Sequence, residues 1–333
     1  MEKRHYNYCL DFIKGIACVF VVFLHCEFPG TTGVIVQAFS RYCVPLFFMV
    51  SGYYYLSVKT LNVAERKRKA WHIGKITIWV TLFYILFGLI RSLLTHTVWA
   101  DFSLYSIGAF LGFNQMFFVV SQMWFLYALL YVYVALIFLN QDWYRRNSLW
   151  IAIICISLYV LLAQGMHIGG IHSPNFVYKN WLIEGFGFFT LGLLLHQYQD
   201  CIRVSNRVLL GIVVITSLLC IVERYLLGRD FGVNICSIPQ VTAMMLYAIN
   251  NPTRYEGVIQ RLGRSCSMMV YILHPAIWHS MDGFYQLVGI WDNMPAQYLK
   301  PILVAGLSIL LAIAFNAMVI ICNQRVSTKR FDE

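Results

Sequence analysis

The chain has 333 residues, of which 59% are hydrophobic and 12% are charged, and its mean hydropathy is +0.66. This composition excludes a soluble globular domain and indicates an integral membrane protein. The formal net charge of +10 is explained largely by membrane topology, so we expect no nucleic-acid partner.

Apolar runs of membrane-spanning length follow one another along the chain. At about 20 apolar residues per span, we predict an all-α integral membrane bundle of ten transmembrane helices, at 10–28, 42–58, 76–95, 121–139, 149–166, 181–197, 208–227, 235–250, 265–281 and 300–322. No repeat, low-complexity tract or long linker divides them. Residues 1–333 are therefore predicted to form one transmembrane domain.

The distribution of Lys and Arg predicts the orientation of the bundle. Connections rich in these residues face the cytoplasm, which with ten spans places both termini there. The predicted inner segments hold Lys3, Arg4, Lys59, Arg66, Lys67, Arg68, Lys69, Lys75, Arg145, Arg146, Arg203, Arg207, Arg254, Arg261, Arg264, Arg325, Lys329 and Arg330, and the outer segments chiefly hold Arg41, Lys179, Arg229 and Lys300.

The first predicted helix carries polar residues along one face. Lys14 and His25 lie eleven residues apart, which is roughly three helical turns plus 20°, and Asp11 lies within about 60° of the same stripe. Residues of this kind avoid lipid and mark functional sites inside membranes. Because Asp11 and Lys14 stand where the apolar core of a secretory signal would begin, we expect an uncleaved anchor.

A basic loop is predicted between the second and third helices, from Lys59 to Lys75, with the run Arg66-Lys67-Arg68-Lys69 near its centre. Clustered cations on the cytoplasmic side bind either anionic lipid headgroups or a ligand that carries phosphate. On the opposite side, the connections 99–122 and 166–180 are long enough to form a lid or a rim over the bundle.

The cysteines and histidines give no sign of a metal site. The ten cysteines show no CxxC pair, and His167 with His172 and His274 with His279 are each five residues apart, so they do not share a helical face. We expect no metal.

Several segments resemble the membrane acyltransferase-3 family, in the order and spacing of that family. These are LDFIKGIA at 10–17 with VVFLH at 21–25, RYCVPLFFMVSGY at 41–53, MWFLY at 123–127, LGRS at 262–265 and YILHP at 271–275. Many members have Arg where this chain has Lys14, a pattern that resembles the subgroup of surface-glycan O-acetyltransferases and the membrane domain attached to some serine racemases. Lys14 can pair with Asp11 but cannot form the bidentate fork of Arg.

The resemblance implies transfer of an acyl group, usually acetyl, from cytoplasmic acyl-coenzyme A to a hydroxyl of a cell-surface polysaccharide or lipid-linked sugar. Imidazole is suited to taking the hydroxyl proton near neutral pH. His25 is therefore predicted to act as general base or to accept the acyl group itself. The remaining predicted catalytic residues are Asp11, Lys14, Glu184 and Arg91, of which the last two either orient His25 and the acceptor or form a structural ion pair.

The predicted donor site combines the basic loop with polar residues of two helices. The loop contributes Arg66, Lys67, Arg68 and Lys69. Ser51 and Tyr53 offer hydroxyls for contact with the donor or, with Gly52, serve close helix packing. Trp124 either stacks on the pantetheine arm or a sugar, or anchors its helix at the interface.

Two other functions stay open from the sequence. A carrier for a serine-like amino acid also places buried charges in its helices, and a noncatalytic component of glycan assembly would leave His25 dispensable. The expected partners are acyl-coenzyme A, a glycan or lipid-linked sugar, and membrane lipids, and a homo-oligomer is compatible with the sequence. The expected location is the bacterial cytoplasmic (inner) membrane.

Overall fold

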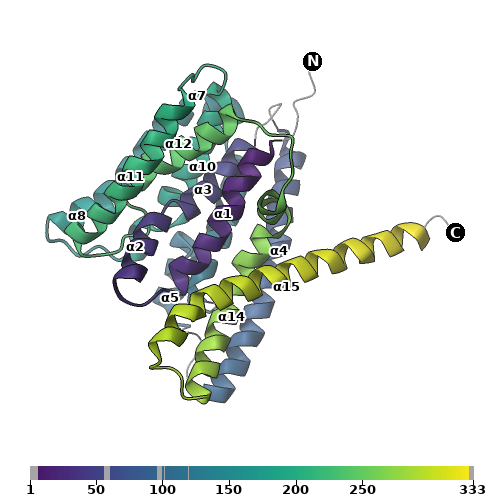
Figure 1. The fold of residues 1–333 in the computed structure, drawn as a ribbon. Helices are drawn as coiled ribbons and strands as arrows, with labels where there is room; N and C mark the ends of the chain where they lie inside the picture. Colours follow the sequence, from purple (N-terminus) through teal and green to yellow (C-terminus); the bar gives the residue numbers. More distant parts are fainter. Residues whose placement is uncertain (1–6, 56–60, 96–99, 101, 119, 330–333) are drawn as a thin grey trace. The chain divides into compact units, whose positions relative to one another are not determined.

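The computed structural model describes residues 7–55, 61–95, 100, 102–118 and 120–329, with side chains as far as residue 322, and it is helical without strands over this part (Figure 1). Lys3, Arg4, Lys59, Trp99 and Arg330, which figured in the predictions, lie outside the described residues. The principal helices are α1 (Tyr8–His25), α2 (Gly30–Ser40), α3 (Cys43–Tyr53), α4 (Val63–Thr95), α5 (Leu104–Phe113), α6 (Trp124–Phe138), α7 (Gln141–Val160), α10 (Phe186–Tyr198), α11 (Asn206–Leu227), α12 (Ser237–Asn250), α14 (Ser267–Leu287) and α15 (Met294–Lys329).

Short helical segments join or extend these helices. They are the 3₁₀ turn η1 (Ser121–Met123), the single-turn helices α8 (Met166–Ile168), α9 (Asn175–Tyr178) and α13 (Val258–Arg261), and the π-helical turns η2 (Leu161–Gly165), η3 (Trp181–Gly185) and η4 (Leu262–Cys266). Turns of the π type are rare and often occur at functional sites.

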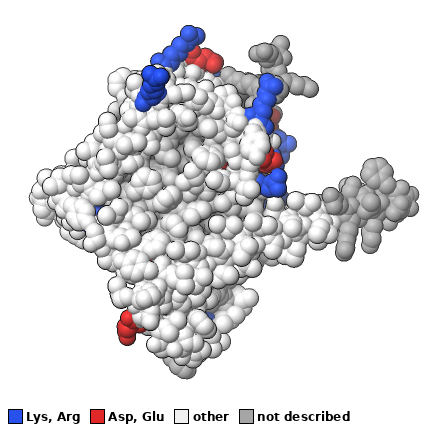
Figure 2. Space-filling model, in the orientation of Figure 1, with Lys and Arg blue, Asp and Glu red and all other residues white. Residues whose placement is uncertain are grey.

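Seven helical stretches in the described residues are long and apolar enough to cross a membrane: 8–25, 30–53, 63–95, 121–138, 141–168, 206–227 and 294–322. The other three predicted spans coincide with helices that are shorter or more polar, namely η3 with α10, α12, and α14. Ten spans and cytoplasmic termini therefore stay predictions. Apolar side chains such as Trp79 and Leu93 are 73% and 77% exposed, and most of the face drawn in Figure 2 is uncharged, as lipid contact requires.

The predicted basic loop is wrong from Val63 onward, because α4 begins there. A reciprocal pair of hydrogen bonds starts this helix: the Glu65 backbone N–H donates to Asn62 Oδ1, and the Asn62 backbone N–H donates to Glu65 Oε2, both at 2.9 Å. This is a capping box with Asn at its first position. Two further helices, α2 and α5, also lie in segments that were predicted as connections.

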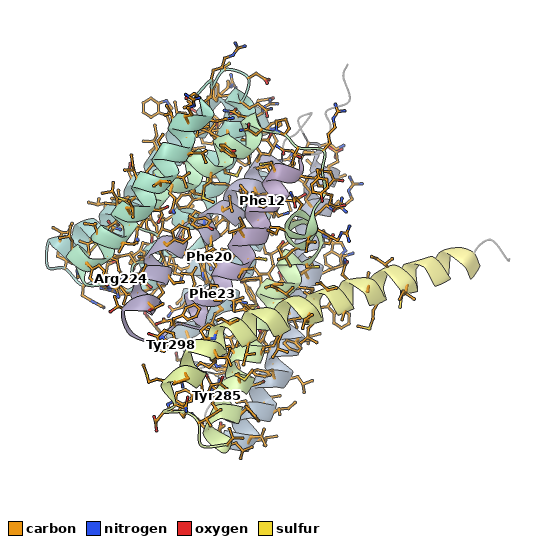
Figure 3. The ribbon with its side chains drawn as sticks, in the orientation of Figure 1. Phe12, Phe20, Phe23, Arg224, Tyr285 and Tyr298 are labelled. Atoms are coloured by element: carbon orange, nitrogen blue, oxygen red, sulfur yellow. The ribbon has the colours of Figure 1, made fainter. Side chains whose placement is uncertain are left out.

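The chain divides into two compact units, residues 1–43 with 247–333 and residues 44–246. In the first unit, α1 packs against α13, η4, α14 and α2. Phe20 and Phe23, labelled along α1 in Figure 3, meet edge to face at 5.8 Å between ring centroids, and Phe20 also contacts Phe39 at 5.2 Å. Tyr298, labelled in the same figure, donates a hydrogen bond to the Pro29 carbonyl at 3.4 Å.

Glycines let the backbones of the first unit approach closely. A β-carbon at Gly263 would overlap the backbone carbonyl oxygen of Asp11, and one at Gly15 would overlap the carbonyl oxygen of Ile259. Small residues at such crossings are typical of membrane helices, whose association depends on close packing. The crossing of α1 with η4 therefore fixes the backbone that carries Asp11.

In the second unit, glycines likewise allow the backbones of α3 and α10 to approach closely. A β-carbon at Gly52 would overlap the carbonyl oxygen of Phe189, and one at Gly192 would overlap that of Met49. Helix α10 also packs on α7, and α6 packs on α4 and η3. The structure thus favours the packing interpretation of the Ser51-Gly52-Tyr53 segment.

Candidate functional site

The first part of the site is an ion pair at the N-terminal end of α1. Asn7 caps the helix by accepting a hydrogen bond from the Cys9 N–H at 2.9 Å, and Asp11 follows in the first turn, where a carboxylate suits the helix dipole. Lys14 Nζ lies 3.0 Å from Asp11 Oδ1, as the sequence predicted. Asp11 is only 1% exposed, and its Oδ2 makes no hydrogen bond to the residues that the structure describes. One acceptor of a buried carboxylate is thus available for a further donor.

The opposite end of α1 carries His25, which forms part of a pair. Its imidazole stacks on that of His274 from α14, with 5.4 Å between ring centroids and 19° between ring planes. His274 is 0% exposed, and its Nδ1 lies 3.2 Å from the Val270 carbonyl oxygen. The sequence singled out His25 but did not connect it with His274, because nothing local links residues 249 positions apart. Only the packing of α1 on α14 brings the two rings together.

Glu184 and Arg91, both in the second unit, occupy different environments. Glu184 is 1% exposed in η3, which begins where Asn180 caps the turn by accepting hydrogen bonds from the backbone N–H groups of Leu182 and Ile183. Arg91 is exposed on α4. Burial raises the pKa of Tyr178 in the connecting segment; Arg229 lowers that pKa, and Asp230 and Glu184 raise it. The negative charge of Glu184 therefore acts on Tyr178, which lies in the connection 166–180.

Three residues of the predicted donor site make local contacts. The Ser51 hydroxyl donates to the Phe47 carbonyl at 2.8 Å, within α3. The Tyr53 hydroxyl donates to Gln199 Oε1 at 2.7 Å. The Trp124 indole is 7% exposed and lies under the Lys179 ammonium, 5.0 Å from the ring centroid. These contacts support a packing task for Ser51 and Tyr53, and a cation–π pair for Trp124.

The basic residues at the start of α4 differ in their surroundings: Arg66 binds the end of a neighbouring helix, whereas Lys67 is exposed. The Nη1 of Arg66 donates to the carbonyl oxygens of Leu136, Ile137 and Leu139, each at 2.9 Å. Those carbonyls end α6 and lack helical partners, so Arg66 caps α6 from a neighbouring helix. Lys67 is exposed.

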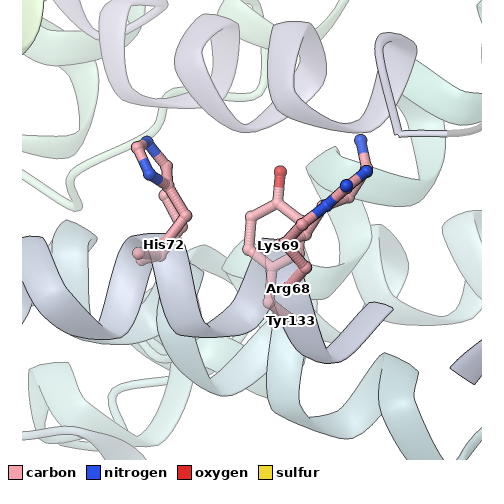
Figure 4. A pocket seen from close by; sticks show the side chains of 5 residues that line it. Arg68, Lys69, His72 and Tyr133 are labelled. Carbon is pink, nitrogen blue, oxygen red and sulfur yellow. The ribbon is translucent and has the colours of Figure 1, made fainter. Parts of the chain in front are cut away.

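The remaining cations of this cluster line a cavity of about 410 Å³ in the second unit (Figure 4). Its lining residues are Arg68, Lys69, His72, Ile73 and Tyr133. The Lys69 ammonium also lies 5.5 Å from the centroid of the Tyr55 ring. His72 was not among the predicted site residues. It lies three and four positions after Lys69 and Arg68, so the three share one face because α4 is helical.

Replacement of Arg66 by glutamine is expected to lower the free energy of unfolding by about 1.5–3 kcal/mol, the usual value of hydrogen bonds to a charged group. Thermal unfolding of the purified protein in detergent measures this change. The matched control is Lys67→Gln, which removes the neighbouring exposed cation and is expected to leave the transition in place. Equal transitions for the two variants would show that Arg66 does not stabilise the end of α6.

The fold and these sites define an all-helical protein of the multi-pass membrane class. Residues 7–321 match the family model described as acyltransferase domain, and the chain belongs to the membrane acyltransferase-3 family. This membership supports an acyltransferase activity. No curated protein and no solved structure matches the chain.

Proposed function

We propose that the protein is an O-acyltransferase, and specifically an O-acetyltransferase, of the bacterial cytoplasmic membrane. It moves the acyl group from cytoplasmic acyl-coenzyme A to a hydroxyl of a cell-surface polysaccharide or lipid-linked sugar. The observation that carries the proposal is the arrangement of α1, with the Asp11–Lys14 pair at one end and His25 at the other. Eleven residues of helix separate Lys14 from His25 by about 16 Å, so one element supplies polar groups across much of a bilayer.

The donor is proposed to bind at the cavity beside the start of α4. Its volume of about 410 Å³ lies within the usual range for small-molecule sites, and Arg68, Lys69 and His72 supply donors and positive charge for the phosphate groups of coenzyme A. Arg66, which was also predicted for the donor site, is left out of this proposal because its Nη1 caps α6. The same cations also suit anionic lipid headgroups, so the test must separate the two ligands.

The chemistry of the acceptor requires removal of a hydroxyl proton and attack on the acyl carbonyl. An imidazole performs the first task as general base or prepares the second by carrying the acyl group. His25 is proposed to be the imidazole that performs one of these two tasks. The buried carboxylate of Asp11 and the ammonium of Lys14 are proposed to stabilise charge at the other end of α1, and no metal is needed for any of these steps.

Replacement of Arg68 or Lys69 by alanine is expected to raise the KM for acetyl-coenzyme A about tenfold to a hundredfold, because each removes a charge-assisted contact to phosphate. The measurement uses membranes that contain the protein, radiolabelled acetyl-coenzyme A and label recovered in glycan. Lys75→Ala, an exposed cation of the same helix, serves as control.

The same assay tests the proposed function as a whole. Label in glycan with the native protein, above membranes that lack it, supports acyl transfer. An absence of label together with intact serine uptake would instead identify a carrier. If the Arg68 and Lys69 variants keep their KM but lose activity only when anionic lipid is present, the cations bind headgroups.

A further inference from the structure

We propose that His274 is a second catalytic residue, which takes the proton from the acceptor hydroxyl while His25 carries the acyl group. The inference deepens the proposed function and rests on it. It assigns one task to each ring of the stacked pair and so decides between the two roles that the sequence left open for His25. The ligand class that meets His274 is an alcohol, the hydroxyl of the acceptor sugar.

The hydrogen bonding of His274 fixes the tautomer of its ring. A carbonyl oxygen can only accept, so the contact of 3.2 Å between Nδ1 and the Val270 oxygen requires a proton on Nδ1. With no exposed surface, the ring is least costly in its neutral form. The Nε2 then carries a lone pair, and it is a hydrogen-bond acceptor of the kind that a general base needs.

This lone pair on Nε2 of His274 has no hydrogen-bond donor among the described residues. The Nε2 is also buried. A buried polar atom without a partner is costly and calls for an explanation. The neighbouring Pro275 lacks a backbone N–H, so it donates no helical hydrogen bond at this point of α14.

His274 also lies close to His25. The ring centroids are 5.4 Å apart. An attacking oxygen needs to lie about 3 Å from the acyl carbon and about 3 Å from the nitrogen that receives its proton. At this separation one acceptor hydroxyl is able to reach both an acyl group on a ring nitrogen of His25 and the in-plane lone pair of Nε2 of His274, at the shared edge of the two rings.

The reaction then balances in two steps. A ring nitrogen of His25 attacks the thioester carbon, the C–S bond breaks, and coenzyme A leaves as the thiolate. Next, the acceptor oxygen attacks the acyl carbon, its proton passes to Nε2 of His274, and the C–N bond breaks with its electron pair returning to His25. The products are the ester and, once the thiolate has taken up one proton, free coenzyme A; His274 returns its proton to the solvent.

The test compares His274→Asn with the native protein and with His25→Asn. The amide N–H of asparagine replaces the Nδ1 donor to Val270, but the lone pair of Nε2 is removed. Purified protein in detergent is given acetyl-coenzyme A and radiolabelled coenzyme A without acceptor, and label exchange between them reports the first step. Hydroxylamine, a nucleophile that needs no base, is added in a second assay, and glycan-bound acetyl is measured in cells.

We expect His274→Asn to keep exchange and hydroxamate formation within about threefold of the native protein while glycan acetylation falls about 100-fold or more. His25→Asn should lose all three. A parallel loss of all three in His274→Asn, and again in His274→Gln at native abundance, would give His274 a packing role and overturn the proposal. Unchanged glycan acetylation, or acetylation by native protein without exchange, would also overturn it. A native protein that neither exchanges nor acetylates would contradict the proposed function itself.

Discussion

Cells that produce the His25→Ala variant are expected to carry at least 100-fold less glycan-bound acetyl than cells with the native protein. The expected loss corresponds to the usual contribution of a positioned acid–base or nucleophilic group. His25 ends α1 and stacks on His274, so its removal takes away a reacting group without opening the packing between α1 and η4. The measurement is alkali-labile acetyl per cell, normalised to the amount of protein in the membrane.

His172→Ala is the matched control, because it removes an imidazole from an exposed connection. We expect it to keep native acetylation. If His25→Ala acetylates as well as this control, His25 is not the catalytic residue, and the interpretation as a noncatalytic assembly component gains support.

The Gly263→Ala variant is expected to lose stability and activity together. The added β-carbon would overlap the Asp11 carbonyl oxygen, and neither backbone can move without separating α1 from η4. Overpacking of this kind costs about 1–3 kcal/mol in soluble cores, and a backbone neighbour relaxes less than a side chain does. We expect the midpoint of thermal unfolding in detergent to fall by several degrees, with a loss of acyl transfer because the Asp11–Lys14 pair shifts.

Gly283→Ala provides a control within the same unit. Gly283 also lies in a helix, α14, but no atom outside its own local helix lies within 4 Å of a β-carbon built there. Alanine is expected to leave stability unchanged or to raise it by up to about 1 kcal/mol, since it favours helix over glycine. A Gly263→Ala variant as stable as Gly283→Ala would show that the crossing of α1 and η4 is not tight in the native protein.

The start of α4 carries a local sequence signal for a helix, the capping box of Asn62 and Glu65. The charged run that begins at Glu65 is not apolar and so predicts a loop, yet Asn62 and Glu65 stand in the spacing of a capping box. That pattern predicts a helix from Val63 without any tertiary information. It would also have placed Arg68, Lys69 and His72 on one face of the helix.

The membrane class, the family, the positions of most helices and the polar stripe of α1 follow from the sequence alone. These features depend on hydropathy and on the helical period, which are properties of neighbouring residues. The tertiary structure alone decided three others: the stacking of His25 on His274, the capping of α6 by Arg66, and the contact of Gly263 with the Asp11 carbonyl. Each joins residues far apart in the chain, and their meeting depends on how whole helices pack, which no local pattern encodes.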